Sequence, residues 1–282
     1  MRTEKPSGTA KLIAAATILL SSENDMENPV PPRAAELCRL FLSNCFSDRV
    51  LARAANFPPT RKLLRMLEAA TLPGIIFHYW NRKRWIETQC TAAISDGFRR
   101  VVIIGAGYDT LGLRLVEKFS KIDIVELDYP ATQSCKLKAL NEIPKNRIEF
   151  IPIDLAKDSV CLKFVTSEPT LFLMEGLLMY LDEEAVIRLF NAIRALSHSR
   201  TRIIFSFMSK WPDGSSGFRP ASRLVQSWLR WRGEPFLWSI EPEAISQFVS
   251  KRGFRVMKME LTQDITVIDS PLDGENLVVC ER

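Results

Sequence analysis

The pattern of hydrophobic and polar positions changes character near residue 95. Before that point, apolar stretches long enough to form helices are separated by prolines, which interrupt helices because they lack a backbone N–H. We therefore predict that residues 1–95 form a helical segment of their own, which would act as a cap. Its expected helices span residues 10–20, 34–46, 61–70 and 74–95.

After residue 95, short aliphatic runs alternate with stretches that suit helices. Such alternation is typical of an α/β fold in which helices cover both faces of a mostly parallel sheet. We therefore predict one domain over residues 96–282. Its expected strands span residues 101–104, 122–126, 148–152, 170–174 and 202–207, and its expected helices span residues 110–119, 131–140 and 183–197.

The first of these strands leads into the most informative turn of the chain. Its aliphatic run ends at Gly105-Ala106-Gly107, a helix follows, and the next strand ends in acids about twenty residues later. Glycine lets the backbone of such a turn approach a ligand closely, so Gly105 and Gly107 are expected ligand contacts. Strand, glycine turn, helix and acidic strand end together indicate a nucleoside-binding unit.

The spacing of the turn distinguishes between nucleosides. The dinucleotide fingerprint requires a third glycine, but Thr110 holds that position and Gly112 comes two residues too late. Asp109 also lies in the turn, where it would repel a phosphate. These features favour a ligand with an adenosine, no phosphate and a positive charge, which describes S-adenosylmethionine. A dinucleotide and a purely structural turn are the alternatives.

The tail of the chain supports the same choice of ligand. A helix is expected over residues 241–252, and strands are expected at 254–261 and 275–280. The short connection between these strands holds Pro271 and Asp273-Gly274, so we predict an antiparallel hairpin. A parallel sheet that ends in such a hairpin is expected for Rossmann-like methyltransferases and not for dehydrogenases.

Acidic side chains stand at the ends of three strands after the glycine turn. An acid directly after an apolar strand is costly to bury without a partner, so its recurrence indicates a ligand site. Asp128, with Glu126 as the rival, can accept hydrogen bonds from both ribose hydroxyls. Asp154 can accept from the adenine amine, with Leu155 against the ring. Glu175 can face the ammonium or the sulfonium of the methionine part.

A cation is still needed for the methionine carboxylate. Arginine offers a planar fork that matches a carboxylate. The helix before the first strand carries Arg82 and Arg84, which are two positions apart and cannot share one face. We predict that Arg82 points inward and binds the carboxylate.

Residues 208–235 read as an irregular insertion after the fifth strand, with four large aromatic side chains. Ligands of open α/β sheets bind beyond the carboxyl ends of the strands, so an insertion at that edge is well placed to cover the substrate. The alternative is a helix that packs on the sheet. The aromatic residues are Trp211, Phe218, Trp228 and Trp231.

Composition narrows the remaining classes of protein. The chain has 282 residues and a net charge of +5 spread along its length, which gives no sign of nucleic-acid binding. Its six cysteines are scattered without C-x-x-C spacing and only two histidines are present, so no metal site is expected. Scattered thiols indicate a reducing compartment, and we expect a cytoplasmic protein.

The apolar run 12–20 is too short for a membrane span and reads as a helix rather than a signal peptide, so no membrane partner is expected.

Four motifs together resemble the leucine carboxyl methyltransferase family, including its bacterial and polyketide-tailoring O-methyltransferase members. They lie at residues 82–87, 104–110, 126–130 and 175–181, and weaker similarity extends to Thr9-Ala10 and to residues 233–236 with Trp238. The resemblance implies a Rossmann-like class I fold. It also implies contacts to S-adenosylmethionine at Arg82, Gly105, Asp128, Asp154, Leu155 and Glu175.

The resemblance implies transfer of a methyl group to oxygen, because family members methylate a protein C-terminal carboxylate, small carboxylic acids or hydroxyls. A carboxylate is already ionised near neutral pH and needs no general base, whereas a hydroxyl usually needs one. His78 and His198 both read as structural, which favours a carboxyl acceptor. Tyr180 can orient the acceptor, or it is a core or rim aromatic. A NAD(P)-dependent oxidoreductase and a catalytically inactive relative are the other functions considered.

Overall fold

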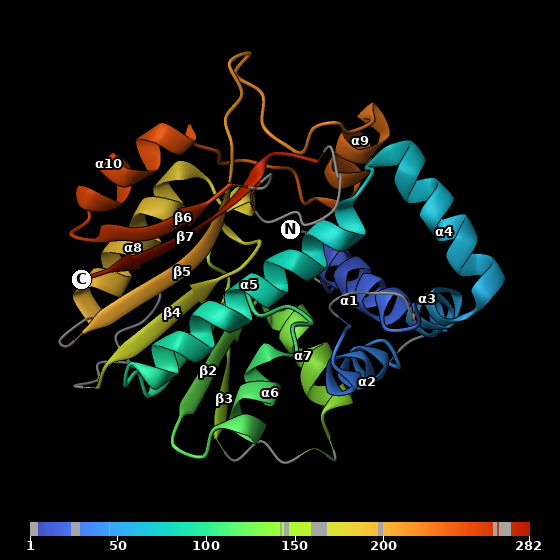
Figure 1. The fold of residues 1–282 in the computed structure, drawn as a ribbon, viewed down its shortest axis with the longest axis horizontal. Coiled ribbons are helices and arrows are strands. Elements are labelled where there is room, and N and C mark those ends of the chain that lie inside the picture. Colours follow the sequence, from blue (N-terminus) through green and yellow to red (C-terminus); the bar gives the residue numbers. More distant parts are fainter. Residues whose placement is uncertain are drawn as a thin grey trace.

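The structure of the protein is a computed structural model that describes residues 5–23, 29–44, 46–141, 143, 147–158, 168–196, 200–261, 264 and 272–282. Within these described residues, seven strands form one sheet in the order β3-β2-β1-β4-β5-β7-β6 (Figure 1). The strands are β1 Arg100–Ile104, β2 Asp123–Asp128, β3 Ile148–Pro152, β4 Thr170–Met174, β5 Thr201–Met208, β6 Arg255–Glu260 and β7 Glu275–Glu281.

The strand directions match the prediction from the sequence. The neighbours among β1 to β5 pair in parallel, and β7 pairs antiparallel with both β5 and β6. The predicted α/β sheet with an antiparallel C-terminal part is therefore confirmed. The chain order reverses at β1, because β2 and β3 extend to one side of it and β4 and β5 to the other. Such a switch point opens a crevice at the carboxyl ends of the strands, where α/β proteins bind ligands.

The central strands are buried on both faces, which explains their continuous aliphatic sequences. On β1, Val101 and Ile103 pack against one group of helices, whereas Val102 and Ile104 pack against another. The first group comprises α5 (Ile75–Ser95), α6 (Leu111–Lys118) and α7 (Pro130–Ala139), and the second comprises α8 (Glu183–Leu196) and α10 (Ile245–Ser250).

Four further helices precede α5 and lie beside the sheet (Figure 1). The first of them, α1, packs on α2, α3 and α5. Apolar residues of α1 and α2 join the same buried cluster as those of β1 and α6, so these helices share a core with the sheet. The predicted division of the chain at residue 95 stays a prediction. The four helices are α1 (Gly8–Leu20), α2 (Pro32–Phe41), α3 (Phe46–Asn56) and α4 (Pro58–Thr71).

The prediction of one helix over residues 34–46 is wrong at the C-terminal end of that helix. The observed helix α2 stops at Phe41, and a separate helix, α3, which we did not predict, begins at Phe46. Ser43 lies between them, and its hydroxyl donates back to a carbonyl in the last turn of α2. Apolar residues continue across this turn, which is why the pattern alone joined the two segments. Cys45, which belongs to the predicted helix, lies outside the described residues.

Other differences from the prediction concern the ends or the regularity of elements. The second strand extends as far as Asp128, which is therefore its last residue rather than the one that follows it. The helix predicted over residues 241–252 is shorter, because a 3-10 turn, η3 (Pro242–Ala244), precedes α10. The insertion after β5, which we expected to be irregular, contains a regular helix, α9 (Arg223–Arg232).

Two further findings concern membrane spans and the cysteines. Within the described residues, no helix is long and apolar enough to cross a membrane. The cysteines that the structure describes, Cys38, Cys90, Cys135 and Cys280, are free thiols. Burial raises the pKa of Cys38 to about 12, so its thiol stays protonated and contributes to packing rather than to reactivity.

A buried ion pair joins β2 to α7 beneath the glycine turn. Lys136 Nζ lies 2.7 Å from Glu126 Oε2, and both side chains are 1% exposed. Lys136 also donates to the backbone carbonyl of Asp109 at 2.7 Å. Gly112 of α6 faces the same carboxylate, since a Cβ there would lie 2.5 Å from Glu126 Oε1. Gly112 therefore provides the close approach of helix and strand that the third glycine provides in a dinucleotide site.

We expect Lys136→Met to destabilise the fold by about 3–5 kcal/mol, because it leaves the Glu126 carboxylate buried without its counter-charge. Urea unfolding followed by circular dichroism measures the change in the free energy of unfolding. Lys138→Met, on the exposed face of the same helix, is the matched control and should cost less than about 0.5 kcal/mol. Equal effects of the two substitutions would show that the ion pair is not what Lys136 contributes.

Candidate functional site

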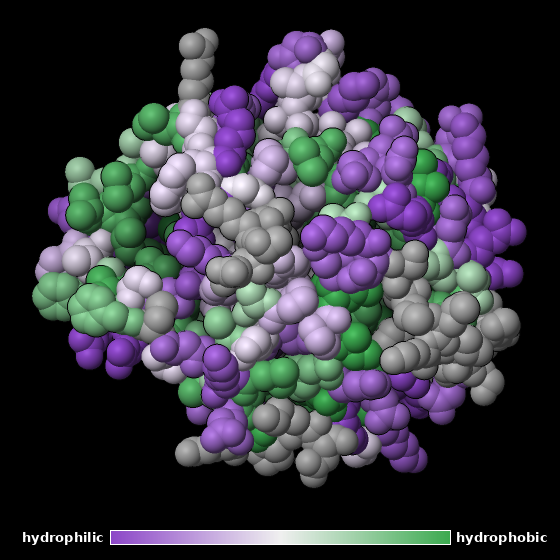
Figure 2. All heavy atoms as spheres, turned by 180° about the vertical axis from the view of Figure 1, so that it is seen from behind, coloured by the Kyte–Doolittle hydropathy of each residue, from purple (hydrophilic) through white to green (hydrophobic). Residues whose placement is uncertain are grey.

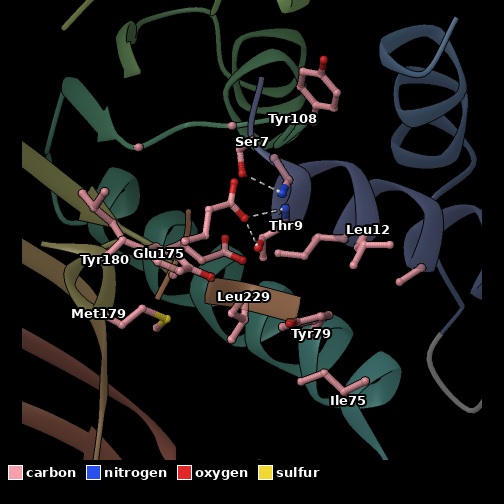
Figure 3. A pocket seen from close by; sticks show the side chains of 18 of the residues that line it. Ser7, Thr9, Leu12, Ile75, Tyr79, Tyr108, Glu175, Met179, Tyr180 and Leu229 are labelled. Atoms are coloured by element: carbon pink, nitrogen blue, oxygen red, sulfur yellow. Dashed lines mark hydrogen bonds between the residues drawn. The ribbon is translucent and has the colours of Figure 1, made fainter. Parts of the chain in front are cut away.

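A cavity of about 590 Å³ opens at the carboxyl ends of β1 to β4 (Figure 3). The sheet edge supplies part of its wall, and α1, α4, α5 and α9 supply the rest. All the residues that the sequence singled out for donor and acceptor binding line this one cavity. They are Arg82, Gly105, Gly107, Asp128, Asp154, Leu155, Glu175 and Tyr180.

The glycine turn after β1 brings the backbone to the cavity surface. Gly105 and Gly107 have φ values of +75° and +48°, in the left-handed region that residues with a side chain rarely adopt. A Cβ on Gly105 would lie 2.9 Å from Leu177 Cδ1, and one on Gly107 would lie 3.3 Å from Ala10 Cβ. A side chain at either position would therefore be strained and would push the surrounding segments apart.

The structure decides which carboxylate of β2 faces the cavity. Glu126 is committed to Lys136 in the interior, whereas Asp128 lines the cavity. Asp128 accepts hydrogen bonds from the backbone N–H groups of Gly107 and Tyr129. Burial raises the pKa of Asp128 to about 6, although these N–H groups act to lower it. The glycine turn thus holds the carboxylate in place, and a carboxylate has lone pairs left for further donors.

The end of β3 contributes Asp154 and Leu155 to the cavity. The Asp154 side chain is 24% exposed, and its Oδ1 accepts from the backbone N–H of Ala156 at 3.2 Å. Leu155 and Ile153 add apolar surface beside it. An acceptor next to an aliphatic surface suits a flat heterocycle that carries an amino group. The adenine contacts expected for Asp154 and Leu155 stay predictions.

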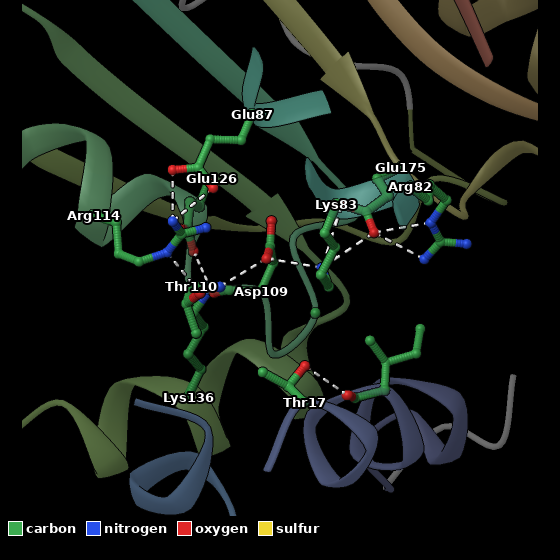
Figure 4. A network of polar contacts seen from close by, with 12 residues as sticks. Thr17, Arg82, Lys83, Glu87, Asp109, Thr110, Arg114, Glu126, Lys136 and Glu175 are labelled. Carbon is green, nitrogen blue, oxygen red and sulfur yellow. Dashed lines mark hydrogen bonds and ion pairs between the residues drawn. The ribbon is translucent and has the colours of Figure 1, made fainter. Parts of the chain in front are cut away.

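Arg82 belongs to a buried charge network, part of which is drawn in Figure 4. Its side chain points inward from α5, as predicted, and the residue is 3% exposed. Its Nε and Nη2 donate to Glu175 Oε1 at 3.0 and 2.8 Å, and its Nη1 donates to both Glu275 oxygens at 2.8 and 2.7 Å. A ligand carboxylate would have to bind the guanidinium alongside these two carboxylates. The predicted contact between Arg82 and the methionine carboxylate stays a prediction.

Lys83, which sequence reasoning missed, extends this network to the glycine turn. Its Nζ lies 2.9 Å from Asp109 Oδ1 and 3.1 Å from Glu175 Oε1. Burial alone would raise the pKa of Asp109, but the Lys83 ammonium lowers it to about 2. The repulsion of phosphate that we expected from Asp109 is therefore offset by an ion pair, and that step of the sequence argument is corrected. The signal in the sequence that could have indicated Lys83 was its position directly after Arg82.

Glu275, at the start of β7, is a second residue that sequence reasoning missed. Its side chain is fully buried, and His78 Nε2 lies 2.8 Å from its Oε2. Burial alone would raise the pKa of Glu275, but Arg82 and, to a smaller extent, His78 lower it to about 2. His78 is thus the buried partner of a carboxylate, in agreement with the structural role predicted for it. His198 lies outside the described residues.

A hydrogen-bonded cluster in the cavity wall joins the first turn of α1 to the segment that follows α9 (Figure 3). Glu234 accepts from the backbone N–H groups of Gly8 and Thr9, in the first turn of α1, at 2.8 and 3.0 Å. It also accepts from the Thr9 hydroxyl at 2.6 Å. Sequence reasoning did not place Glu234 in the site, although the weak similarity at Thr9 and at residues 233–236 was the signal that marked both segments.

Tyr180 lines the cavity close to this cluster, in the 3-10 turn η2 (Leu178–Tyr180). Its ring packs on Phe236, with the two ring centroids 5.7 Å apart. Burial raises the pKa of Tyr180 above its usual range, although Thr9 acts to lower it. Tyr180 therefore stays a phenol at neutral pH, so it can orient a bound molecule and is no general base.

The insertion after β5 contributes α9 to the cavity wall. Phe218, Trp228 and Leu229 line the cavity, so this segment covers it, in agreement with the first of the two interpretations of the insertion. Trp211 instead holds its own loop together, because its indole N–H donates to the Gly217 carbonyl at 2.9 Å.

Comparison with known proteins points to one family. The family described as leucine carboxyl methyltransferase matches residues 34–194. A Mycolicibacterium paratuberculosis protein named as an S-adenosyl-L-methionine-dependent methyltransferase is 30% identical over 263 residues, which cover 88% of this chain and 82% of that protein. A Mycobacterium marinum protein of the same name is 31% identical over 232 residues, which cover 79% of this chain and 72% of that protein.

Solved structures agree on the fold. A methyltransferase from Thermobifida fusca is similar with a TM-score of 0.60 and 14% identity, over 99% of this chain and 95% of that chain. Magnesium protoporphyrin IX methyltransferase from Synechocystis, solved with bound S-adenosylhomocysteine, has a TM-score of 0.51 and 13% identity, over 95% of this chain and 99% of that chain.

Fold, site and relatives together define a Rossmann-like methyltransferase that depends on S-adenosylmethionine. The glycine turn and the strand-end acids fit this donor, because they offer backbone approach and hydrogen-bond acceptors at the switch point of the sheet. The chain belongs to the leucine carboxyl methyltransferase family. This membership sets aside the NAD(P)-dependent oxidoreductase that the sequence left as an alternative.

The raised pKa of Asp128 predicts a pH dependence of stability. The pKa is about 6 in the folded protein against a usual value of 3.8, so the contribution of Asp128 to stability falls as the pH rises through this range. Asp128→Asn removes the titrating group. We therefore expect the stability of Asp128→Asn relative to the unsubstituted protein to increase between about pH 4 and about pH 7. Urea titrations across this range measure the difference, and a difference that stays flat contradicts the raised pKa.

Proposed function

We propose that this methyltransferase transfers the methyl group to an oxygen atom, either a carboxylate or a hydroxyl, of a small molecule or of a protein C-terminus. The observation that carries the proposal is the continuity of the cavity. One end is bounded by the glycine turn and the strand-end acids, and the other end is bounded by apolar helices and Tyr180. A donor and an acceptor can therefore lie in one space, and their alignment supplies most of the acceleration of an in-line displacement.

The residues at the sheet edge suit the donor chemically. Asp128, held by two backbone N–H groups, has lone pairs left for both ribose hydroxyls. Asp154 and Leu155 suit the adenine, and Glu175 suits the positively charged methionine end. When bound, S-adenosylmethionine supplies a methyl group on a positively charged sulfur. The proposed donor contacts are Arg82, Gly105, Gly107, Asp128, Asp154, Leu155 and Glu175.

The remaining wall of the cavity suits the acceptor. Helices α1 and α4 belong to the N-terminal segment and line this end, which supports the role of residues 1–95 as a cap that shapes the acceptor site, with residues 96–282 holding the donor. Tyr180 is the proposed orienting residue, because it lines the cavity and its ring packs on Phe236. The complete set of donor-binding residue types speaks against an inactive relative.

We expect Asp128→Ala to weaken binding of S-adenosylhomocysteine by about 1–3 kcal/mol, or roughly 5-fold to 150-fold, because it removes two hydrogen bonds to the ribose. Isothermal titration calorimetry measures the affinity. Asp123→Ala, at the exposed start of the same strand, is the matched control and should bind like the unsubstituted protein. Unchanged affinity in Asp128→Ala rejects the ribose role.

Transfer of label from methyl-labelled S-adenosylmethionine tests the reaction itself. We expect labelled products when small carboxylic acids, phenols and alcohols are offered as acceptors. Mild base separates the two oxygen chemistries, since it cleaves a methyl ester and leaves a methyl ether intact. Amines and thiols are offered in parallel, and label found only on nitrogen or sulfur contradicts transfer to oxygen. A folded protein that binds no donor contradicts the donor site.

A further inference from the structure

The cavity carries an excess of negative charge. Among the described residues that line it, seven are acids and two, Arg82 and Lys83, are cations. Both cations lie within 2.9 Å of carboxylates of the protein. Arg65 and Lys157, outside the lining, pair with Glu68 and Asp154, and acids still outnumber cations when they are included. An anionic acceptor would therefore enter a negatively charged space. The acids are Glu68, Asp109, Asp128, Asp154, Glu175, Glu234 and Glu275.

The acceptor end is otherwise lined by aliphatic and aromatic side chains, such as Leu64 of α4, Ile75 of α5 and Leu229 of α9. Leu67 and Leu224 line the cavity and are also 52% and 71% exposed, so they mark an apolar mouth at α4 and α9. Figure 2 shows hydrophobic side chains gathered at its left edge, the side of the molecule where α4 lies. Walls and a mouth of this kind favour a lipophilic acceptor.

We propose that the acceptor is an uncharged, lipophilic hydroxyl compound, a phenol or an alcohol. This assignment rests on the proposed function and reverses the preference for a carboxylate that the sequence suggested. The acceptor oxygen forms a bond to the methyl carbon while the carbon–sulfur bond breaks and its electron pair stays on sulfur. The hydroxyl proton passes to a carboxylate of the cavity lining.

Calorimetry with two matched probes tests the charge preference. 2-Naphthol and 2-naphthoate share one ring system, but near neutral pH the first is uncharged and the second is an anion. We expect the protein loaded with S-adenosylhomocysteine to bind 2-naphthol at least about tenfold more tightly than 2-naphthoate. Equal affinities, tighter binding of 2-naphthoate, or no binding of 2-naphthol overturn the proposal.

Two neighbouring substitutions on α4 place a cation inside or outside the cavity. Leu67 lines the cavity, whereas Met66 is 62% exposed and is not among the lining residues. We expect Leu67→Lys to shift the ratio of the two affinities toward 2-naphthoate by about tenfold, and Met66→Lys to leave the ratio unchanged. A shift of the same size in both variants shows that charge outside the cavity sets the preference, and it contradicts the proposal.

The affinity for S-adenosylhomocysteine, measured on the same samples, separates the acceptor class from the proposed function. Donor-product binding together with a preference for 2-naphthoate overturns the acceptor class and leaves methyl transfer intact. A folded protein that binds no S-adenosylhomocysteine overturns the proposed function, while the affinities of the two probes still report the charge preference of the cavity.

Discussion

The guanidinium of Arg82 connects the parts of the molecule on which the site depends. Arg82 comes from α5, and its two carboxylate partners follow β4 and begin β7. Arg82 is 3% exposed. A charge buried to this extent is tolerated only when it is paired and hydrogen-bonded. Removing one partner of such a pair typically lowers the free energy of unfolding by about 3–5 kcal/mol, because the other charge stays buried without a counter-charge. The position of α5 against the carboxyl edge of the sheet is therefore held electrostatically as well as by apolar packing.

The same network sets the polarity of the cavity. Arg82 and Lys83 pair with acids at the donor end, and Glu234 is satisfied by the first turn of α1 at the acceptor end. The excess of acids over cations in the lining suits a positively charged donor. It also disfavours an anionic acceptor beside it. One distribution of charge can thus serve donor binding and acceptor selection together.

The sheet could be predicted because residues close together in the sequence determine each of its strands. A parallel strand buried on both faces must be a continuous aliphatic run, as Val101 to Ile104 are, and a glycine turn with positive φ leaves its residues visible in the sequence. Reasoning from neighbouring residues failed where apolar residues continue across a turn, as they do between α2 and α3. It succeeded for the inward direction of Arg82, because Arg82 and Arg84 are two positions apart and cannot face the same way.

The partners of these residues were not predictable in the same way. Glu275 lies 193 residues from Arg82, and Glu234 lies 225 residues from Thr9. Contacts of this length leave no periodicity or spacing in the sequence, and they form only when the sheet brings distant segments to one edge. The donor end could therefore be assembled from strand ends, whereas the acceptor end required the structure.

A crystal structure with S-adenosylhomocysteine tests most directly the central claim that the cavity at the glycine turn holds the methyl donor. We predict that both ribose hydroxyls lie within about 2.5–3.2 Å of the Asp128 carboxylate, with the adenine against Leu155 and the sulfur directed toward the end of the cavity that holds Tyr180. A ribose bound elsewhere, with the Asp128 carboxylate contacting only Gly107 and Tyr129, would contradict the claim.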